Sequence, residues 1–161
     1  MANKRASIAL TEGEVGALLR AARTMVLVTN GPDGVPDPVP MWFVVDPAGV
    51  VWMRTYAASQ KVLNLVRDPR FAALVETGDH YLELRGAQLS GTVTLVEDID
   101  RITAVFADLM VKYEGLELEH VEAVRTAYRD RAVKQRALRL DVTRVASWDH
   151  AKQAVGSGST E

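Results

Sequence analysis

The sequence predicts a mainly β protein with flanking α-helices, folded as a small closed or split barrel. Short β-prone segments follow one another with tight turns between them, which is typical of antiparallel meanders. One helical segment precedes these strands, a short one interrupts them, and a pair comes before the last strand. Long, bent antiparallel strands with helices at their margins favour a barrel.

Composition and charge exclude several functional classes. The chain has 161 residues, of which 48% are hydrophobic and 25% charged, enough for one well-packed core. A formal net charge of -2 gives no indication of a nucleic-acid partner. The absence of cysteine excludes disulfides, thiolate metal ligands and a cysteine nucleophile. No apolar run approaches a membrane span and the N-terminus does not resemble a secretion signal, so we expect a cytoplasmic protein.

The chain is expected to form one domain over residues 1–150, followed by a disordered tail over 151–161 that is rich in Gly and Ser. The histidines His80, His120 and His150 are far apart and lack ligand spacing, which predicts no metal site.

The first elements are a helix and a hairpin. Thr11 and Glu14 form a capping box, and apolar residues at helical spacing then predict a helix over 12–23. A buried strand over 24–30 and a tight turn over 31–34 follow.

The second strand, 35–45, carries prolines at positions of one parity, Pro36, Pro38 and Pro40. Proline cannot donate a ladder hydrogen bond, so this part of the strand is expected at a sheet edge. A turn over 46–49 leads to the third strand, 50–55.

A short helix is expected after the third strand. Ser59 is a suitable N-cap, and Pro69 ends the helix. The apolar face is expected to consist of Val62, Leu63, Leu65 and Val66. A strand over 71–76 follows.

The longest predicted strand, 81–97, changes its apolar parity. Leu82 and Leu84 occupy even positions, whereas Leu89 and Val93 occupy odd ones. A parity change beside Gly86 predicts a bulge or bend at that residue.

A helix pair over about 98–134 is inserted before the last strand. Asp98 is expected to cap the first helix and Gly115 to end it, and the second helix covers about 117–134. The alternating segment 137–142 is the predicted last strand.

The stretch RTYAASQK, residues 54–61, places a lysine at the start of a predicted helix. Lys61 falls in the first turn of a helix, where a cation opposes the helix dipole unless an anion is bound. Thr55 and Ser59 would add hydroxyls and Arg54 a second charge, a donor set that suits phosphate. The alternative is that Ser59 only caps the helix and Lys61 points into water.

Four segments occur in order that together resemble the flavin- and deazaflavin-binding split β-barrel family, also called pyridoxamine-phosphate-oxidase-like. They are LTEGE, LVTNGPDGVPDPVPMWFVVD, VVWMRTYAASQKVLNLVRDPRFAALVE and LRGAQLSGTVTLVED. The resemblance covers residues 10–97 well and 136–148 loosely. It implies a homodimer with cofactor clefts shared between the subunits. It also implies a cofactor phosphate at Thr55, Ser59, Gln60 and Lys61, and a cofactor ring beside the strand through Pro40, Met41 and Trp42.

The resemblance implies two cofactors, the deazaflavin F420 or, alternatively, FMN. True pyridoxamine-phosphate oxidases end in an Arg-Leu-x-Pro-type segment, whereas this chain ends in SWDHAKQAVGSGSTE. We therefore expect an F420-dependent reductase that transfers hydride to a small conjugated substrate. An FMN-binding oxidoreductase and a non-catalytic cofactor-binding protein are the alternatives. No Ser-His-Asp set or carboxylate pair is evident, so the catalytic residues are unknown at this stage.

Overall fold

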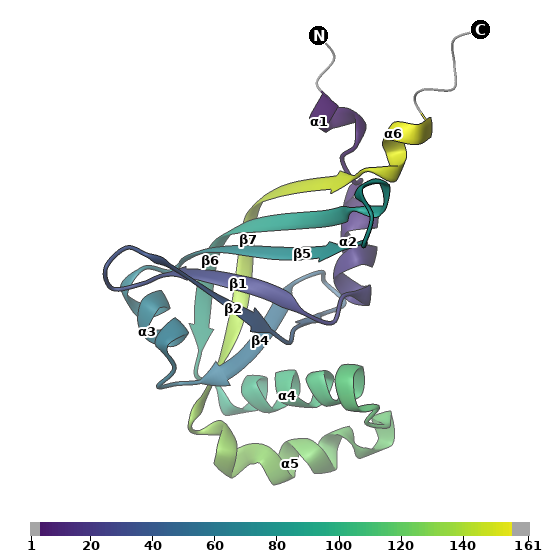
Figure 1. The fold of residues 1–161 in the computed structure, drawn as a ribbon. Coiled ribbons are helices and arrows are strands. Elements are labelled where there is room, and N and C mark those ends of the chain that lie inside the picture. Colours follow the sequence, from purple (N-terminus) through teal and green to yellow (C-terminus); the bar gives the residue numbers. More distant parts are fainter. Residues whose placement is uncertain (1–3, 156–161) are drawn as a thin grey trace, which may run out of the picture.

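One chain segment, residues 36–45, joins the two edges of a seven-stranded antiparallel sheet with the order β2-β1-β5-β6-β7-β4-β3. The computed structural model describes residues 4–155. The strands are β1 (Met25–Asn30), β2 (Pro36–Met41), β3 (Val44–Val45), β4 (Val51–Tyr56), β5 (Arg70–Thr77), β6 (Arg85–Val96) and β7 (Gln135–Asp149). Since β2 and β3 are neighbours in the chain but lie at opposite edges, the sheet curls into a half-barrel (Figure 1).

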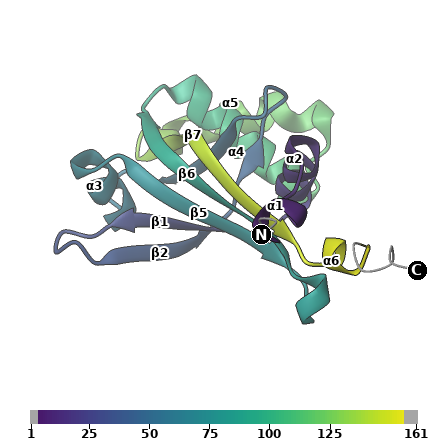
Figure 2. The same cartoon turned by 90° about the horizontal axis from the view of Figure 1, so that it is seen from above.

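Helices cover the outside and the ends of this curled sheet. They are α1 (Lys4–Ser7), α2 (Glu12–Ala21), α3 (Gln60–Arg67), α4 (Ile99–Glu114), α5 (Val121–Ala132) and α6 (Ala151–Val155), with 3₁₀ turns η1 (Tyr81–Glu83) and η2 (Leu118–His120). Helices α4 and α5 lie side by side along one side of the sheet, and α3 and α2 lie near opposite ends of it (Figures 1 and 2). Within residues 4–155, no helix is both long enough and apolar enough to cross a bilayer.

The apolar core has two parts. The larger part fills the barrel interior and includes Met25, Leu27, Phe43, Met53, Leu89 and Leu138. The smaller part lies between the outer face of β4 and the helix pair and includes Trp52, Ile102, Val105, Tyr128 and Ala137. Alternate residues of β4 thus serve two cores, because successive side chains of a strand point to opposite faces.

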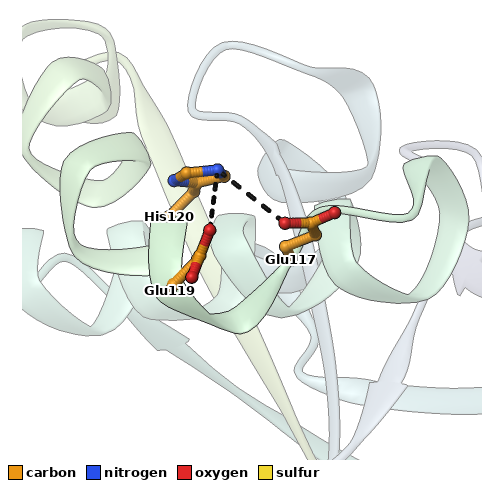
Figure 3. Close-up of side chains that lie close together, drawn as sticks. All are labelled: Glu117, Glu119 and His120. Atoms are coloured by element: carbon orange, nitrogen blue, oxygen red, sulfur yellow. Dashed lines mark ion pairs between the residues drawn. The ribbon is translucent and has the colours of Figure 1, made fainter.

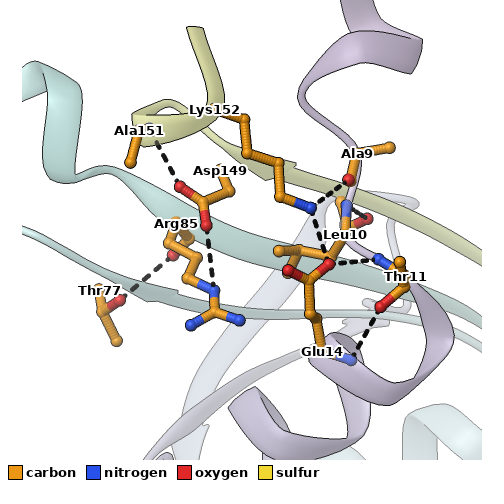
Figure 4. Close-up of polar contacts among 10 residues, drawn as sticks. Ala9, Leu10, Thr11, Glu14, Thr77, Arg85, Asp149, Ala151 and Lys152 are labelled. Atoms are coloured by element: carbon orange, nitrogen blue, oxygen red, sulfur yellow. Dashed lines mark hydrogen bonds and ion pairs between the residues drawn. The ribbon is translucent and has the colours of Figure 1, made fainter. Parts of the chain in front are cut away.

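The capping box of the first helix is confirmed. Thr11 Oγ1 accepts the Glu14 N–H at 3.3 Å, and Glu14 Oε2 accepts the Thr11 N–H at 2.7 Å. Lys152 of α6 donates to the same carboxylate at 2.7 Å (Figure 4). The expected tail is therefore partly wrong, because residues 151–155 form a helix; residues 156–161 lie outside the described part of the chain.

The predicted strand 35–45 is divided in two. Its proline-rich part, β2, lies at a sheet edge as expected. The ladder then stops at Trp42 and Phe43 and resumes as β3 at the other edge. The Tyr113 hydroxyl of α4 accepts the Phe43 N–H at 3.1 Å and donates to its carbonyl at 3.0 Å, replacing the missing ladder bonds.

The predicted irregularity at Gly86 is wrong. Leu82 belongs to the 3₁₀ turn η1, and this turn, not a bulge, causes the parity change. The register shift lies instead between Ser90 and Gly91, opposite β7. Gly86 has a different role, since a Cβ there would lie 2.4 Å from the Trp148 ring.

The last strand is longer than the alternating pattern indicated. β7 extends to Asp149, so Trp148, expected after the strand, lies within it. The helix pair is confirmed, with Asp98 accepting the Arg101 N–H and Gly115 in the left-handed conformation at the end of α4.

Candidate functional site

Three side chains converge where β4 leads into α3. The Thr55 hydroxyl lies 3.3 Å from the Ser59 hydroxyl and accepts a hydrogen bond from Lys61 Nζ at 3.4 Å. Ser59 occupies the N-cap position, as expected, but its hydroxyl does not cap the helix. The structure thus brings together three of the residues, Thr55, Ser59 and Lys61, for which the sequence predicted a common role.

Hydrogen-bond donors outnumber acceptors at this helix start. Within residues 4–155, the N–H groups of Gln60 and Lys61 have no hydrogen-bond acceptor, and the first turn has no acidic residue. Two N–H groups, two hydroxyls and an ammonium therefore lie within residues 55–61, and among the described residues Lys61 has no carboxylate within salt-bridge distance. This donor set fits a phosphate group, which takes several donors at once.

A buried asparagine fixes the position of α3. Asn64 is fully buried, and its amide donates to Thr29 Oγ1 and to Asp37 Oδ2, each at 3.0 Å. Its carbonyl oxygen accepts from Gln60 Nε2 at 2.9 Å, so the Gln60 side chain is already engaged within the protein. Sequence reasoning missed Asn64, although a polar residue between Leu63 and Leu65 was a visible signal.

The expected apolar face of α3 is half wrong. Val62 and Leu65 are buried, but Leu63 and Val66 are 53% and 71% exposed, because Asn64 takes a place on the inward side. The inward face is thus narrower than the apolar pattern indicated, and part of it is polar.

The segment after α3 is held by charged groups. Asp68 accepts from Asn30 Nδ2 at 2.7 Å and pairs with Arg70 at 2.7 Å. Hydrogen bonds from Arg70 hold the pKa of the Asp68 carboxyl well below its usual range. Arg67 donates to the Asn30 carbonyl and to Asn64 Oδ1. Arg67 and Asp68 therefore connect α3 to Asn30 of β1, whereas the contact of Arg70 with Asp68 is local.

Arg54 lies apart from this group. Its guanidinium donates to the Tyr128 hydroxyl at 2.5 Å and to Gln135 Oε1 at 2.8 Å. Neighbouring residues of a strand face opposite sides of the sheet, so Arg54 points toward the helix pair while Thr55 faces the α3 side.

The residues expected beside the cofactor ring differ in exposure. Met41 is buried in the barrel core and Pro40 is exposed. Trp42 is 46% exposed and stacks on Tyr113 with ring centroids 4.3 Å apart and an interplanar angle of 4°. This contact was not identified from the sequence. The inserted helix pair therefore reaches the strand that the resemblance places at the ring.

Lys112 lies beside the same stack. Its Nζ donates to the Phe43 carbonyl at 3.1 Å and lies 4.1 Å from the Phe43 ring centroid. Burial, together with the charge of Arg23, lowers the pKa of Lys112 to about 8.

A small group of possible metal ligands occurs at η2 and the residue before it, where no metal site was predicted. Potential ligand atoms of Glu117, Glu119 and His120 lie within 4.8 Å of one another (Figure 3). The His120 ring nitrogen is 3.5 Å from Glu119 and 4.0 Å from Glu117. All three side chains are exposed and near neighbours in sequence, and ion pairs of this kind contribute little to stability.

A family model described as Pyridoxamine 5'-phosphate oxidase matches residues 11–149. The chain belongs to this family. Membership of the pyridoxamine 5'-phosphate oxidase family agrees with the curled antiparallel sheet and confirms the resemblance read from the sequence. No curated protein matches the chain.

Solved structures extend this finding. The conserved hypothetical protein Rv2991 from Mycobacterium tuberculosis is 35% identical, with a TM-score of 0.84, and the match covers 98% of this chain and 96% of that one. A protein named F420 reductase is 25% identical, with a TM-score of 0.63, over 84% of this chain and 98% of that one. An FAD-binding protein from Mesorhizobium loti shares the fold at 16% identity and a TM-score of 0.59, over 86% of this chain and 94% of that one.

Proposed function

We propose that this protein is an F420-dependent oxidoreductase that transfers hydride between the deazaflavin and a small conjugated organic substrate. The observation that carries the proposal is the set of phosphate-type donors at the start of α3 in a member of the pyridoxamine 5'-phosphate oxidase family. The similarity to an F420 reductase at 25% identity favours the deazaflavin.

In this proposal some residues bind the cofactor phosphate and others hold α3 in position. Lys61, Thr55 and Ser59 hold the cofactor phosphate together with the N–H groups of the first turn of α3. The Gln60 side chain does not compete for the phosphate, since its amide is bonded to Asn64. The network around Asn64 keeps α3 in place, so the donors are oriented before binding and little reorganisation is required.

The strand around Pro40–Trp42 lies alongside the cofactor ring in this proposal. When bound, the deazaflavin supplies hydride transfer at a ring carbon. The protein positions the substrate against that ring and excludes water, and no side-chain nucleophile is required. The exposed Trp42, supported by Tyr113, provides an aromatic surface on which a planar substrate would stack.

FMN is the alternative cofactor because it also carries a phosphate group, so the donors at α3 could bind either molecule. The experiment is a fluorescence titration of the purified, cofactor-free protein with F420 and with FMN in parallel. Binding of F420 at least about ten-fold tighter than FMN, a difference of about 1.4 kcal/mol, supports the proposal. Tighter binding of FMN, or no binding of F420, would overturn it.

Turnover separates an enzyme from a cofactor-binding protein. Reduced F420 is mixed with the protein and a panel of conjugated enones and quinones, and its oxidation is followed by absorbance. Oxidation that requires both protein and substrate supports the oxidoreductase. Tight F420 binding with no turnover on any substrate would favour the non-catalytic alternative.

A further inference from the structure

Arg54 carries an unneutralised charge against the helix pair. Its guanidinium carbon lies 5.1 Å from the Phe106 ring centroid and 5.2 Å from that of Tyr128. Both hydrogen-bond acceptors of Nη1, the Tyr128 hydroxyl and Gln135 Oε1, are neutral. Nε is buried and has no hydrogen-bond partner within residues 4–155, as is also the case for Arg85 and Arg125, so the distinguishing feature of Arg54 is the missing carboxylate. A partly buried cation without a counter-ion is costly, so the arrangement calls for an anion from elsewhere.

Other partly buried arginines form an ion pair with a carboxylate. Arg136 pairs with Glu97 at 2.8 Å, Arg125 with Glu122 at 2.8 Å and Arg85 with Asp149 at 3.6 Å. In the part of the chain that the structure describes, Arg54 has no carboxylate within salt-bridge distance. Arg54 is therefore partly buried without the carboxylate partner that these other arginines have.

Arg54 lines a cavity of about 540 Å³, a volume in the range of small-molecule sites. The cavity is bounded by Arg54, Tyr56, Phe106, Tyr128, Asp130, Arg131, Lys134 and Gln135. Among the lining residues, Arg54, Arg131 and Lys134 are cationic and Asp130 is anionic. The lining therefore carries a formal charge of 3 − 1 = +2. Tyr56, which is 67% exposed, adds an aromatic wall.

We propose that this cavity is a second anion site, separate from the one at α3, that binds a small phosphate monoester. A phosphate dianion matches the formal charge of the lining, and guanidinium groups suit its oxygens. The tyrosine rings would pack on an attached aromatic or apolar group. The site lies across β4 from Thr55 and needs neither Lys61 nor a bound flavin, so it stands independently of the proposed function.

The test is isothermal titration calorimetry of the cofactor-free protein with phenyl phosphate, with inorganic phosphate as the second probe. Wild-type protein should bind one phenyl phosphate at this cavity, more tightly than inorganic phosphate. Exposed cations are substituted first, because Arg131→Ala with Lys134→Ala leaves the core intact. Loss of two charge-assisted contacts should weaken binding at least about ten-fold.

Two further variants locate the binding. Arg54→Met should also weaken phenyl phosphate binding about ten-fold or more, and added phenyl phosphate should raise the Tm of wild-type protein more than that of this variant. Lys61→Ala should leave phenyl phosphate binding at this cavity unchanged while it weakens F420 binding. Unchanged binding in the Arg131→Ala, Lys134→Ala variant, or loss of binding in Lys61→Ala alone, would overturn the proposal.

Discussion

At the scale of single residues, Lys61 is the clearest case in which a local cost indicates a function. Its ammonium lies in the first turn of α3, where the helix dipole disfavours a cation, and its only hydrogen bond within residues 4–155 is a 3.4 Å contact to Thr55. A bound phosphate would convert this cost into a favourable interaction.

Lys61→Ala should therefore weaken F420 binding about ten- to a hundred-fold, since a charge-assisted hydrogen bond contributes about 1.5–3 kcal/mol. The Tm of the cofactor-free protein should not fall, because the substitution removes a cation that opposes the helix dipole. Arg129→Ala is the matched control, because it removes an arginine that pairs with Asp100 at the protein surface. Equal, small losses of affinity in both variants, measured by fluorescence titration, would place the phosphate elsewhere.

Asn64 acts on the same site through the fold. Asn64→Leu keeps the shape of the side chain but leaves Thr29 and Asp37 without their buried partner. We expect a loss of about 2 kcal/mol in the free energy of unfolding, the cost of an unsatisfied buried polar group. Urea denaturation measures it, with Leu63→Asn as an exposed control that should change stability by no more than about 0.5 kcal/mol. Wild-type stability in Asn64→Leu would show that the network contributes nothing.

At the scale of elements, the start of α2 and the helix α6 are joined by one carboxylate. The hydrogen bond from Lys152 and those with Thr11 lower the pKa of Glu14 from 4.5 to about 2. A carboxyl whose pKa is lower in the folded state stabilises the protein above its unfolded pKa, and this contribution is lost as the pH falls through the folded value.

The Tm of wild-type protein should therefore fall more steeply than that of Lys152→Met as the pH decreases from 4.5 to about 2. Lys134→Met is the control, since Lys134 has no carboxylate partner within the described residues. Parallel Tm curves for wild type and Lys152→Met would mean that the contact with Glu14 does not persist in solution.

Strand β6 depends on a glycine that alternation did not identify. A Cβ at Gly91 would lie 2.0 Å from the Asp141 carbonyl oxygen of β7, at the register shift. Gly91→Ala should lower the free energy of unfolding by about 1–3 kcal/mol. By contrast, Gly13→Ala, with nothing within 4 Å of the added methyl, should stabilise α2 by about 0.5–1 kcal/mol. Urea denaturation of both variants tests these two predictions. Wild-type stability for Gly91→Ala would show that the β6–β7 ladder can shift to make room for the added methyl group.

Local signals explain which elements could be predicted. The capping box at Thr11, the proline parity of β2 and the caps of α4 depend on neighbouring residues, and each was readable from the sequence. The division at Trp42 and the bulge near Gly91 depend on partners far along the chain, Tyr113 and Asp141. The grouping of Thr55, Ser59 and Lys61 is also local, whereas Arg54 and Asn64 depend on tertiary neighbours that periodicity does not identify.

At the scale of the whole molecule, apolar side chains remain exposed on several elements, including α3 and β7. Leu63 and Val66 of α3 are 53% and 71% exposed, and Val142 and Val145 of β7 are 36% and 46% exposed. The two valines also line a cavity of about 580 Å³ against α2. Exposed apolar groups beside a cavity often mark an interaction surface. Together with the homodimer that the family resemblance implies, the exposed valines of β7 lead us to predict that two copies associate through β7 and α2.

Light scattering after size-exclusion chromatography should give the mass of a dimer for wild-type protein. Val145→Asp should shift it to monomer, because a carboxylate buried in an apolar interface without a partner is strongly unfavourable. Val133→Asp, which changes an equally apolar and 65% exposed residue at the end of α5, is the control and should remain dimeric. If the cofactor cleft is shared between subunits, F420 affinity should fall at least about ten-fold in the monomeric variant and stay unchanged in the control. A Val145→Asp monomer that binds F420 as tightly as wild-type protein would show that one chain contains the complete site.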